Sequence, residues 1–151
     1  MLVRVTKQFS FEMAHALMDY DGPCKNIHGH SYRLDVTVAG YPIVEAGNPK
    51  LGMVIDFGQL KSIVNEAVLN IFDHSTVLNE LSALGNQLDL NLVFGNLLLV
   101  PYQPTCENLL LDMRERILTS LPDNIFLVST RLHETATAFA EIIEKFSDNG
   151  N

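Results

Sequence analysis

Two stretches near the amino terminus alternate between apolar and polar side chains. From Val3 to Met13 the odd-numbered positions are mostly apolar, and from His28 to Val38 the even-numbered positions are His, His, Tyr, Leu, Val and Val. Side chains two apart leave a strand on the same side, so each stretch predicts a strand with one buried face.

Two further stretches repeat apolar residues at helical spacing. Residues 56–72 predict an amphipathic helix that begins at Asp56, with Gln59 three residues later as in a capping box. Residues 105–121 predict a second helix with Thr105 as its N-cap. We expect both helices to pack their apolar faces on the sheet.

The carboxyl-terminal part of the chain returns to strand patterns. Residues 125–134 predict one strand, in which the even-numbered side chains from Phe126 to Glu134 share one side, and about 137–144 predict another. The segment 81–103 contains two short apolar runs around Gly95 and Asn96, which fit either a hairpin or a contact surface for another subunit.

The order of these elements indicates the fold class. Two strands, two helices and two strands favour an α+β domain with an antiparallel four-stranded sheet, in the order β-β-α-α-β-β. The length of 151 residues suits one domain. We expect that domain over residues 1–146, with a frayed tail at 147–151.

Composition limits the classes of partner. A net charge of −8 argues against nucleic-acid and anionic-membrane binding, which need basic surfaces. The first residues do not resemble a signal peptide, and no stretch reaches the roughly 18 apolar residues of a spanning helix, so we expect a cytoplasmic protein. The two cysteines, Cys24 and Cys106, are too few for a disulfide scaffold.

Three histidines fall on buried strand faces. His28 and His30 share one side of their strand, and His15 continues the buried face of the preceding strand. Three imidazoles with a vacant fourth position are typical of catalytic zinc, whereas His-x-His alone is commonly just polar residues at a strand edge. Cys24, in the connecting loop, adds either a reactive thiol or a fourth ligand that would make the zinc structural.

Four other residues offer acid–base chemistry, and each has an ordinary structural alternative. Asp73 and His74 at a helix end form either a proton-handling pair or a helix cap. Glu107 lies in a first helical turn, where the helix dipole alone stabilises a carboxylate. Glu134 continues a buried face, so we expect it to meet a ligand's N–H donors or a salt-bridge partner.

Six segments, in order, resemble the 6-pyruvoyltetrahydropterin synthase family, and more closely its bacterial 6-carboxytetrahydropterin synthase branch of queuosine biosynthesis. They span most of the chain and are Phe9–His15, Cys24–Tyr32, Met53–Lys61, Asp73–Asn79, Pro104–Leu109 and Glu134–Thr135. The resemblance implies a tunnelling-fold subunit with two helices on one face of the sheet. It also implies a homohexamer, a dimer of trimers, with active sites between subunits.

The resemblance also implies a role for each candidate residue. His15, His28 and His30 would bind Zn²⁺, and Cys24 would be the general base. Asp73 and His74 would be a second proton-handling pair, contributed to another subunit's Cys24. Substrate binding falls to Thr105, Glu107 and Glu134, of which Glu134 anchors the pterin ring.

The implied reaction is zinc-dependent conversion of 7,8-dihydroneopterin triphosphate to 6-carboxy-5,6,7,8-tetrahydropterin, with loss of triphosphate and acetaldehyde. One alternative is the 6-pyruvoyl-forming enzyme, which only eliminates triphosphate. Another is a non-catalytic pterin-binding module that keeps zinc for stability. The sequence departs from the family at 81–103, which is longer than in compact relatives, and in the last strand.

Overall fold

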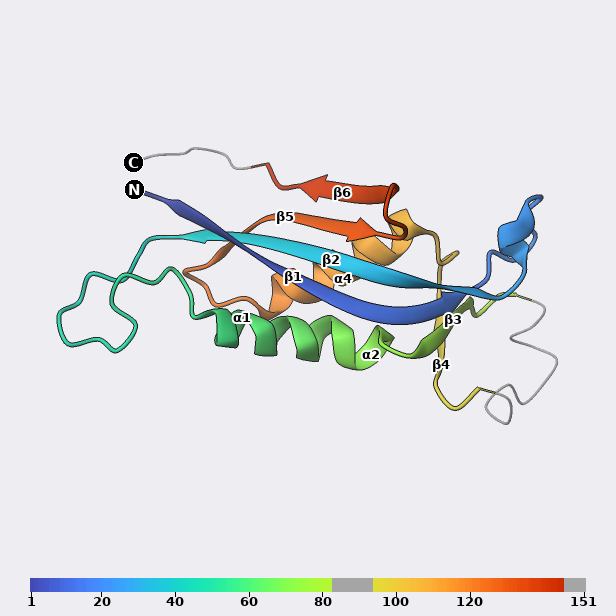
Figure 1. Cartoon of the computed structure of the whole chain (residues 1–151), viewed down its shortest axis with the longest axis horizontal. Coiled ribbons are helices and arrows are strands. Elements are labelled where there is room, and N and C mark those ends of the chain that lie inside the picture. Colours follow the sequence, from blue (N-terminus) through green and yellow to red (C-terminus); the bar gives the residue numbers. More distant parts are fainter. Residues whose placement is uncertain (83–93, 146–151) are drawn as a thin grey trace.

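A computed structural model describes residues 1–82 and 94–145 of the chain. Its two longest strands, β1 (Val3–His15) and β2 (His28–Gly40), run along the length of the molecule (Figure 1). They pair antiparallel in unbroken register from Val3 opposite Gly40 to His15 opposite His28. The predicted inner face is confirmed over much of both strands, whose buried members include Phe9, Phe11, Met13, Tyr32, Leu34, Val36 and Val38.

The first helical stretch runs without a break from α1 (Phe57–Val64) through a π-helical turn (Asn65–Leu69) into α2 (Asn70–Phe72). Its predicted cap is confirmed, because an oxygen of the Asp56 side chain accepts from the backbone N–H of Gly58 at 2.6 Å. The Gly58 N–H lies in the first turn, where backbone donors have no partner inside the helix, and the Asp56 side chain supplies the missing acceptor.

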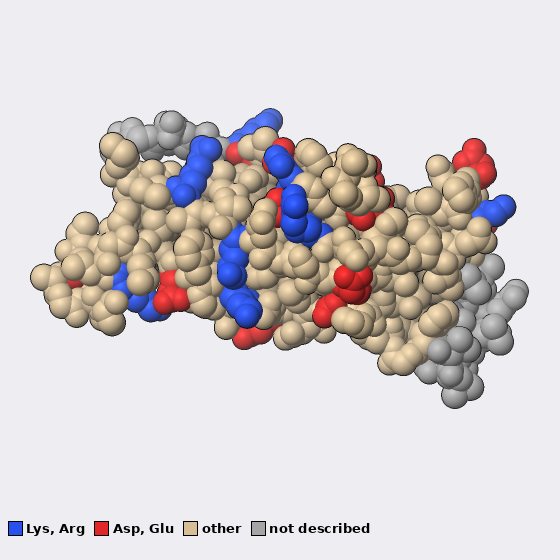
Figure 2. Space-filling model, in the orientation of Figure 1, with Lys and Arg blue, Asp and Glu red and all other residues tan. Residues whose placement is uncertain are grey.

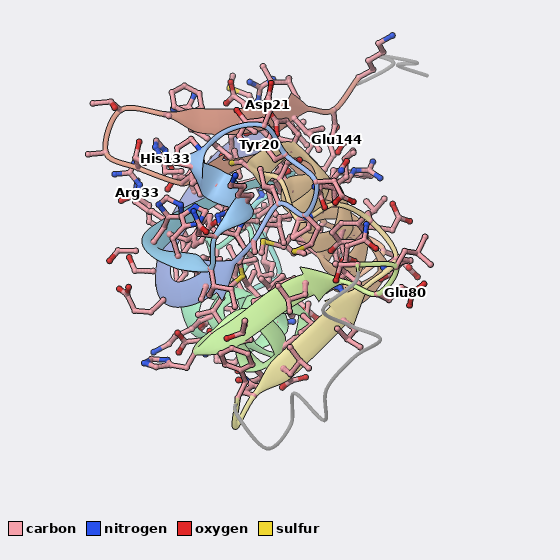
Figure 3. All side chains as sticks on the ribbon, turned by 90° about the vertical axis from the view of Figure 1, so that its right-hand side faces the viewer. Tyr20, Asp21, Arg33, Glu80, His133 and Glu144 are labelled. Atoms are coloured by element: carbon pink, nitrogen blue, oxygen red, sulfur yellow. The ribbon has the colours of Figure 1, made fainter. Side chains whose placement is uncertain are left out.

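The second helix, α4 (Cys106–Ser120), begins where the sequence predicts. The Thr105 hydroxyl accepts from the backbone N–H of Asn108 at 3.3 Å, as expected for an N-cap. The helix is joined to the end of the chain by a bidentate ion pair, in which Arg114 donates to both carboxylate oxygens of Glu144 at 2.7 Å. Glu144 is labelled in Figure 3, just beyond the last strand.

The sheet contradicts part of the predicted architecture. In the described part of the chain it has six strands in the order β4-β3-β1-β2-β5-β6, and β3 runs parallel to both β1 and β4. The expected antiparallel four-stranded sheet in the order β-β-α-α-β-β is therefore wrong, although the α+β class holds. The four remaining strands are β3 (Ser75–Asn79), β4 (Leu97–Val100), β5 (Phe126–His133) and β6 (Phe139–Ile143).

Burial explains why β3 and β4 escape pattern analysis. The first four residues of β3 are all buried, including the polar Ser75 and Thr76, so the strand has no exposed face and shows no alternation of apolar and polar residues. Strand β4 is a four-residue apolar run within the segment 81–103, too short to be distinguished from other buried structure by pattern. Residues 83–93 of that segment and the predicted tail at 147–151 lie outside the described residues.

One prediction about β5 also fails. Phe126 is 45% exposed, whereas Leu127 and Val128 are both buried. The pairing of β2 with β5 shifts register between Thr37 and Val38, and such an irregularity inserts an extra residue that reverses the side-chain alternation. Beyond it, Thr130 and Leu132 face the core as predicted.

Seen end-on in Figure 3, the sheet curls around the helices, with β6 on one side and β3 and β4 on the other. On the face shown in Figure 2, basic and acidic side chains are scattered among broad uncharged areas. The net negative charge therefore forms no continuous acidic surface there. Within the described residues, the helices are too short or too polar to traverse a bilayer.

Candidate metal centre and active site

The three predicted histidines meet where β1 ends and β2 begins. His15 lies directly opposite His28 in the sheet, and His30 lies opposite Met13. Ring centroids are 4.6 Å apart for His15 and His28, 5.2 Å for His15 and His30, and 4.9 Å for His28 and His30. One nitrogen from each ring lies within 4.8 Å of the other two. This spacing lets three imidazoles surround one metal ion.

Backbone carbonyls orient two of these rings. Nδ1 of His15 lies 2.7 Å from the carbonyl oxygen of Pro104, and Nδ1 of His28 lies 2.8 Å from that of Asn26. A carbonyl only accepts, so each Nδ1 carries the proton and each Nε2 keeps its lone pair. Metal-binding histidines are commonly held in this way.

The chemistry of the cluster fits a metal such as zinc. The buried Nε2 of His30 has no hydrogen-bond partner among residues 1–82 and 94–145, as expected of a nitrogen reserved for a metal. His15 is only 1% exposed, and burial lowers its pKa, which favours the neutral, ligating form. Three neutral imidazoles are a recognised donor set for catalytic zinc.

Cys24 lies in the connection between the two histidine strands, on a short 3-10 turn, Pro23–Lys25. The thiol is half-buried, and the backbone N–H of Leu17 donates to the Cys24 carbonyl at 2.8 Å, which holds the turn against the end of β1. Among the described residues, the group of potential metal ligands consists of the three histidines and does not include Cys24. The thiol is therefore placed near the cluster without joining it.

Asp73 and His74 occupy the turn between α2 and β3. Oδ1 of Asp73 lies 2.9 Å from Nδ1 of His74 and accepts the backbone N–H of Glu12 at 3.0 Å. His74 has a φ of 57°, in the left-handed region that non-glycine residues seldom adopt, and its N–H donates to the Glu12 carbonyl at 2.6 Å. The two side chains thus form an oriented carboxylate–imidazole pair.

The pocket beside this pair reaches the histidine cluster. His74 lines an open pocket of about 370 Å³ together with Glu12, His30 and Thr76. Glu12 is exposed and alternates along β1 with the buried Met13 and His15, so the pocket includes the outward side of the sheet. Within the described residues, no hydrogen bond or ion pair links Asp73 or His74 to Cys24.

Glu134 brings the end of β5 to the histidine cluster. Its Oε1 lies 3.6 Å from Nε2 of His15 and 4.0 Å from Nε2 of His30. The same side chain lines a small cavity of about 120 Å³ with Glu107 and Cys106. The structure therefore brings two of the three predicted substrate-binding residues together, while Thr105 caps the helix that carries Glu107.

Sequence reasoning missed two residues of this region. Tyr32 is fully buried, and its hydroxyl lies 3.4 Å from both His15 Nε2 and Glu134 Oε1. It shares the parity of His28 and His30, which could have identified it. Cys106 donates from its thiol to the Leu132 carbonyl at 3.4 Å, and burial raises the pKa of this thiol to about 11. In the sequence, Cys106 directly precedes the predicted substrate-binding residue Glu107, and this position could have identified it.

Fold and site together define an α+β protein with a candidate three-histidine metal centre beside acidic and thiol side chains. The family described as 6-pyruvoyl tetrahydropterin synthase matches residues 4–145. This chain belongs to that family, and the resemblance drawn from its six segments is confirmed.

Individual relatives agree with this assignment. A protein of Haemophilus influenzae named 6-carboxy-5,6,7,8-tetrahydropterin synthase is 35% identical over 95% of this chain and 100% of its own length. Among solved structures, an uncharacterized protein from Wolinella succinogenes aligns with a TM-score of 0.77 at 16% identity, over 96% of this chain and 99% of that one. The 6-pyruvoyl tetrahydropterin synthase of Caenorhabditis elegans aligns at 0.67 and 23% identity, over 95% and 96%. At these identities the two structures show the shared fold alone.

Proposed function

We propose that this protein is a zinc-dependent lyase that converts 7,8-dihydroneopterin triphosphate to 6-carboxy-5,6,7,8-tetrahydropterin, with loss of triphosphate and acetaldehyde, in queuosine biosynthesis. The observation that carries the proposal is the cluster of His15, His28 and His30 beside Glu134, in a chain that matches a 6-carboxytetrahydropterin synthase along its length. The proposal includes a cytoplasmic location. Both cysteines are free, and thiols stay reduced in the cytoplasm.

His15 and His28 would hold the zinc through the Nε2 atoms that their backbone hydrogen bonds leave free, and His30 through its Nε2, which has no hydrogen-bond partner among the described residues. Bound there, zinc supplies Lewis-acid polarisation of substrate oxygens. Glu134 anchors the amino-pyrimidine edge of the pterin, because an ionised carboxylate accepts strong hydrogen bonds from N–H donors. Glu107 and Thr105 line the same binding region, which the cavity shared by Glu107 and Glu134 supports.

Cys24 accepts a proton from the substrate side chain as general base. Asp73 holds His74 through Nδ1, so that the other ring nitrogen is free to exchange a second proton. A neighbouring copy supplies this pair to Cys24, which the lack of a hydrogen bond or ion pair between the pair and Cys24 within the described residues supports. The active protein is therefore a homo-oligomer, and we propose the hexamer, a dimer of trimers.

One preparation tests the proposal. Zinc is measured by elemental analysis, and the products from 7,8-dihydroneopterin triphosphate are separated by chromatography on the same sample. Stoichiometric zinc with release of triphosphate and acetaldehyde is the expected result. Triphosphate release with an unstable diketone product indicates the 6-pyruvoyl-forming reaction instead. Pterin binding without turnover indicates a non-catalytic binding module.

A further inference from the structure

Tyr32 occupies the boundary between the histidine cluster and Glu134. Its side chain is 0% exposed, and its ring stacks on Phe11 with centroids 5.3 Å apart and planes 11° apart. The rings of His15 and His30 meet it edge-on, at 6.1 Å and 5.5 Å. Contacts on several sides leave the phenol ring little freedom to turn, so the position of its hydroxyl is set by packing.

The hydroxyl has one hydrogen and two neighbouring acceptors. It lies 3.4 Å from Oε1 of Glu134 and 3.4 Å from Nε2 of His15. Nδ1 of His15 carries its proton toward the Pro104 carbonyl, so Nε2 presents only a lone pair, which is the lone pair that a metal would take. With that lone pair committed to a metal, Glu134 is the acceptor that remains for the Tyr32 hydrogen.

The contacts of Glu134 divide its two carboxylate oxygens. Oε1 is the atom that approaches Tyr32, His15 and His30. Among the described residues, the hydrogen bond from Tyr32 involves Oε1 and not Oε2, and Glu134 also lines the cavity that it shares with Glu107 and Cys106. Holding one oxygen fixes the direction in which the other points.

We propose that Tyr32 is a positioning residue that holds Glu134 through Oε1 and thereby aims Oε2 at the N–H donors of the bound pterin. This inference rests on the proposed function, because it takes Glu134 as the pterin anchor. It makes the phenol a link between the metal centre and the ligand pocket. The Tyr32 ring packs against two histidines of the metal centre, and its hydroxyl reaches the carboxylate that recognises the ligand.

The test uses the intact protein with zinc bound and the variant Tyr32→Phe, which keeps the stacked ring and removes only the hydroxyl. The probe is 7,8-dihydroneopterin, which lacks the triphosphate leaving group, titrated by calorimetry. We expect its Kd to rise about 10-fold, since a hydrogen bond to a charged acceptor is lost. Zinc content stays at the wild-type value, and with the triphosphate substrate KM rises more than kcat falls.

A matched control comes from the same chain. The Tyr102 hydroxyl donates to Asp112 of α4 at 2.6 Å, and within the described residues neither side chain forms a hydrogen bond or ion pair with the candidate site residues. Tyr102→Phe therefore keeps the wild-type Kd for the pterin. A double-mutant cycle separates positioning from general packing: in a Glu134→Gln background, Tyr32→Phe weakens binding by much less than 10-fold, because the anchored charge is already gone.

Each outcome decides the inference. An unchanged Kd in Tyr32→Phe, equal losses in the wild-type and Glu134→Gln backgrounds, or loss of zinc would each overturn it. If the wild-type protein binds no pterin, the proposed function fails. In that case a crystal structure of Tyr32→Phe still decides whether the hydroxyl holds the carboxylate: a turned Glu134 side chain supports the link, and an unmoved one refutes it.

Discussion

Replacing Cys24 with alanine distinguishes a general base from a metal ligand. The thiol lies on the Pro23–Lys25 turn, and the backbone bond from Leu17 to the Cys24 carbonyl does not involve the side chain, so the turn should keep its shape. The thiol is half-buried, and its removal deletes one atom from a partly solvated place. We therefore expect only a small loss of stability, below about 1 kcal/mol.

The effect on activity should be far larger than the effect on folding. A positioned general base contributes roughly 10² to 10⁴ in rate, so kcat of Cys24→Ala should fall by about that factor. This corresponds to about 3–5 kcal/mol of transition-state stabilisation. The zinc content should stay at the wild-type value, because the ligand atoms within 4.8 Å of one another come from three histidines.

The assay measures zinc by elemental analysis and turnover of the triphosphate substrate on the same purified variant. His28→Ala serves as the control that must lose zinc, since it removes one of the three imidazoles. Simultaneous loss of zinc and activity in Cys24→Ala would refute the reasoning and make the thiol a fourth ligand. A cobalt-substituted wild-type sample gives an independent check, because sulfur coordination produces a distinct absorption band.

Four other measurements follow from the structure. Thr105→Ala should destabilise the fold by about 1 kcal/mol through loss of the α4 cap, and Thr105→Ser should recover most of this in urea denaturation. Cys106, with a pKa of about 11, should react with iodoacetamide slowly at pH 8 and faster as the pH approaches 11, measured in a Cys24→Ala background; fast alkylation at pH 8 would contradict its burial. Burial lowers the pKa of His15 below the value of about 6.5 for an unfolded chain, so this residue contributes stability that is complete above that pH and declines as the pH falls. Urea denaturation of metal-free protein at pH 7.5 and 5.5 should show this decline, and His15→Gln should reduce it. Chelation of the metal from the wild-type protein should lower Tm, and added zinc should restore it; an unchanged Tm would argue against a bound metal.

The local patterns of the chain were sufficient for several elements and for the metal candidates. Period-two alternation placed His15 on the inner face of β1 and His28 and His30 together on β2, and the unbroken register of the two strands brought the rings together. The caps at Asp56 and Thr105 were also visible locally, because a cap involves residues only two or three apart.

Other features depended on contacts between distant parts of the chain. Strands β3 and β4 show no alternation of apolar and polar residues to mark them, and their parallel pairing comes from the tertiary arrangement. The Pro104 carbonyl that orients His15 comes from 89 residues away, and Glu134 reaches Tyr32 across 102 residues.

Sequence alone thus determined which residue types lie on which face of the long strands, since side-chain direction along a strand follows from backbone geometry. Only the tertiary structure decided which of those side chains meet. The Tyr32–Glu134 contact and the orientation of His15 depend on how the curled sheet and its helices pack, and that packing has no local signature in the chain.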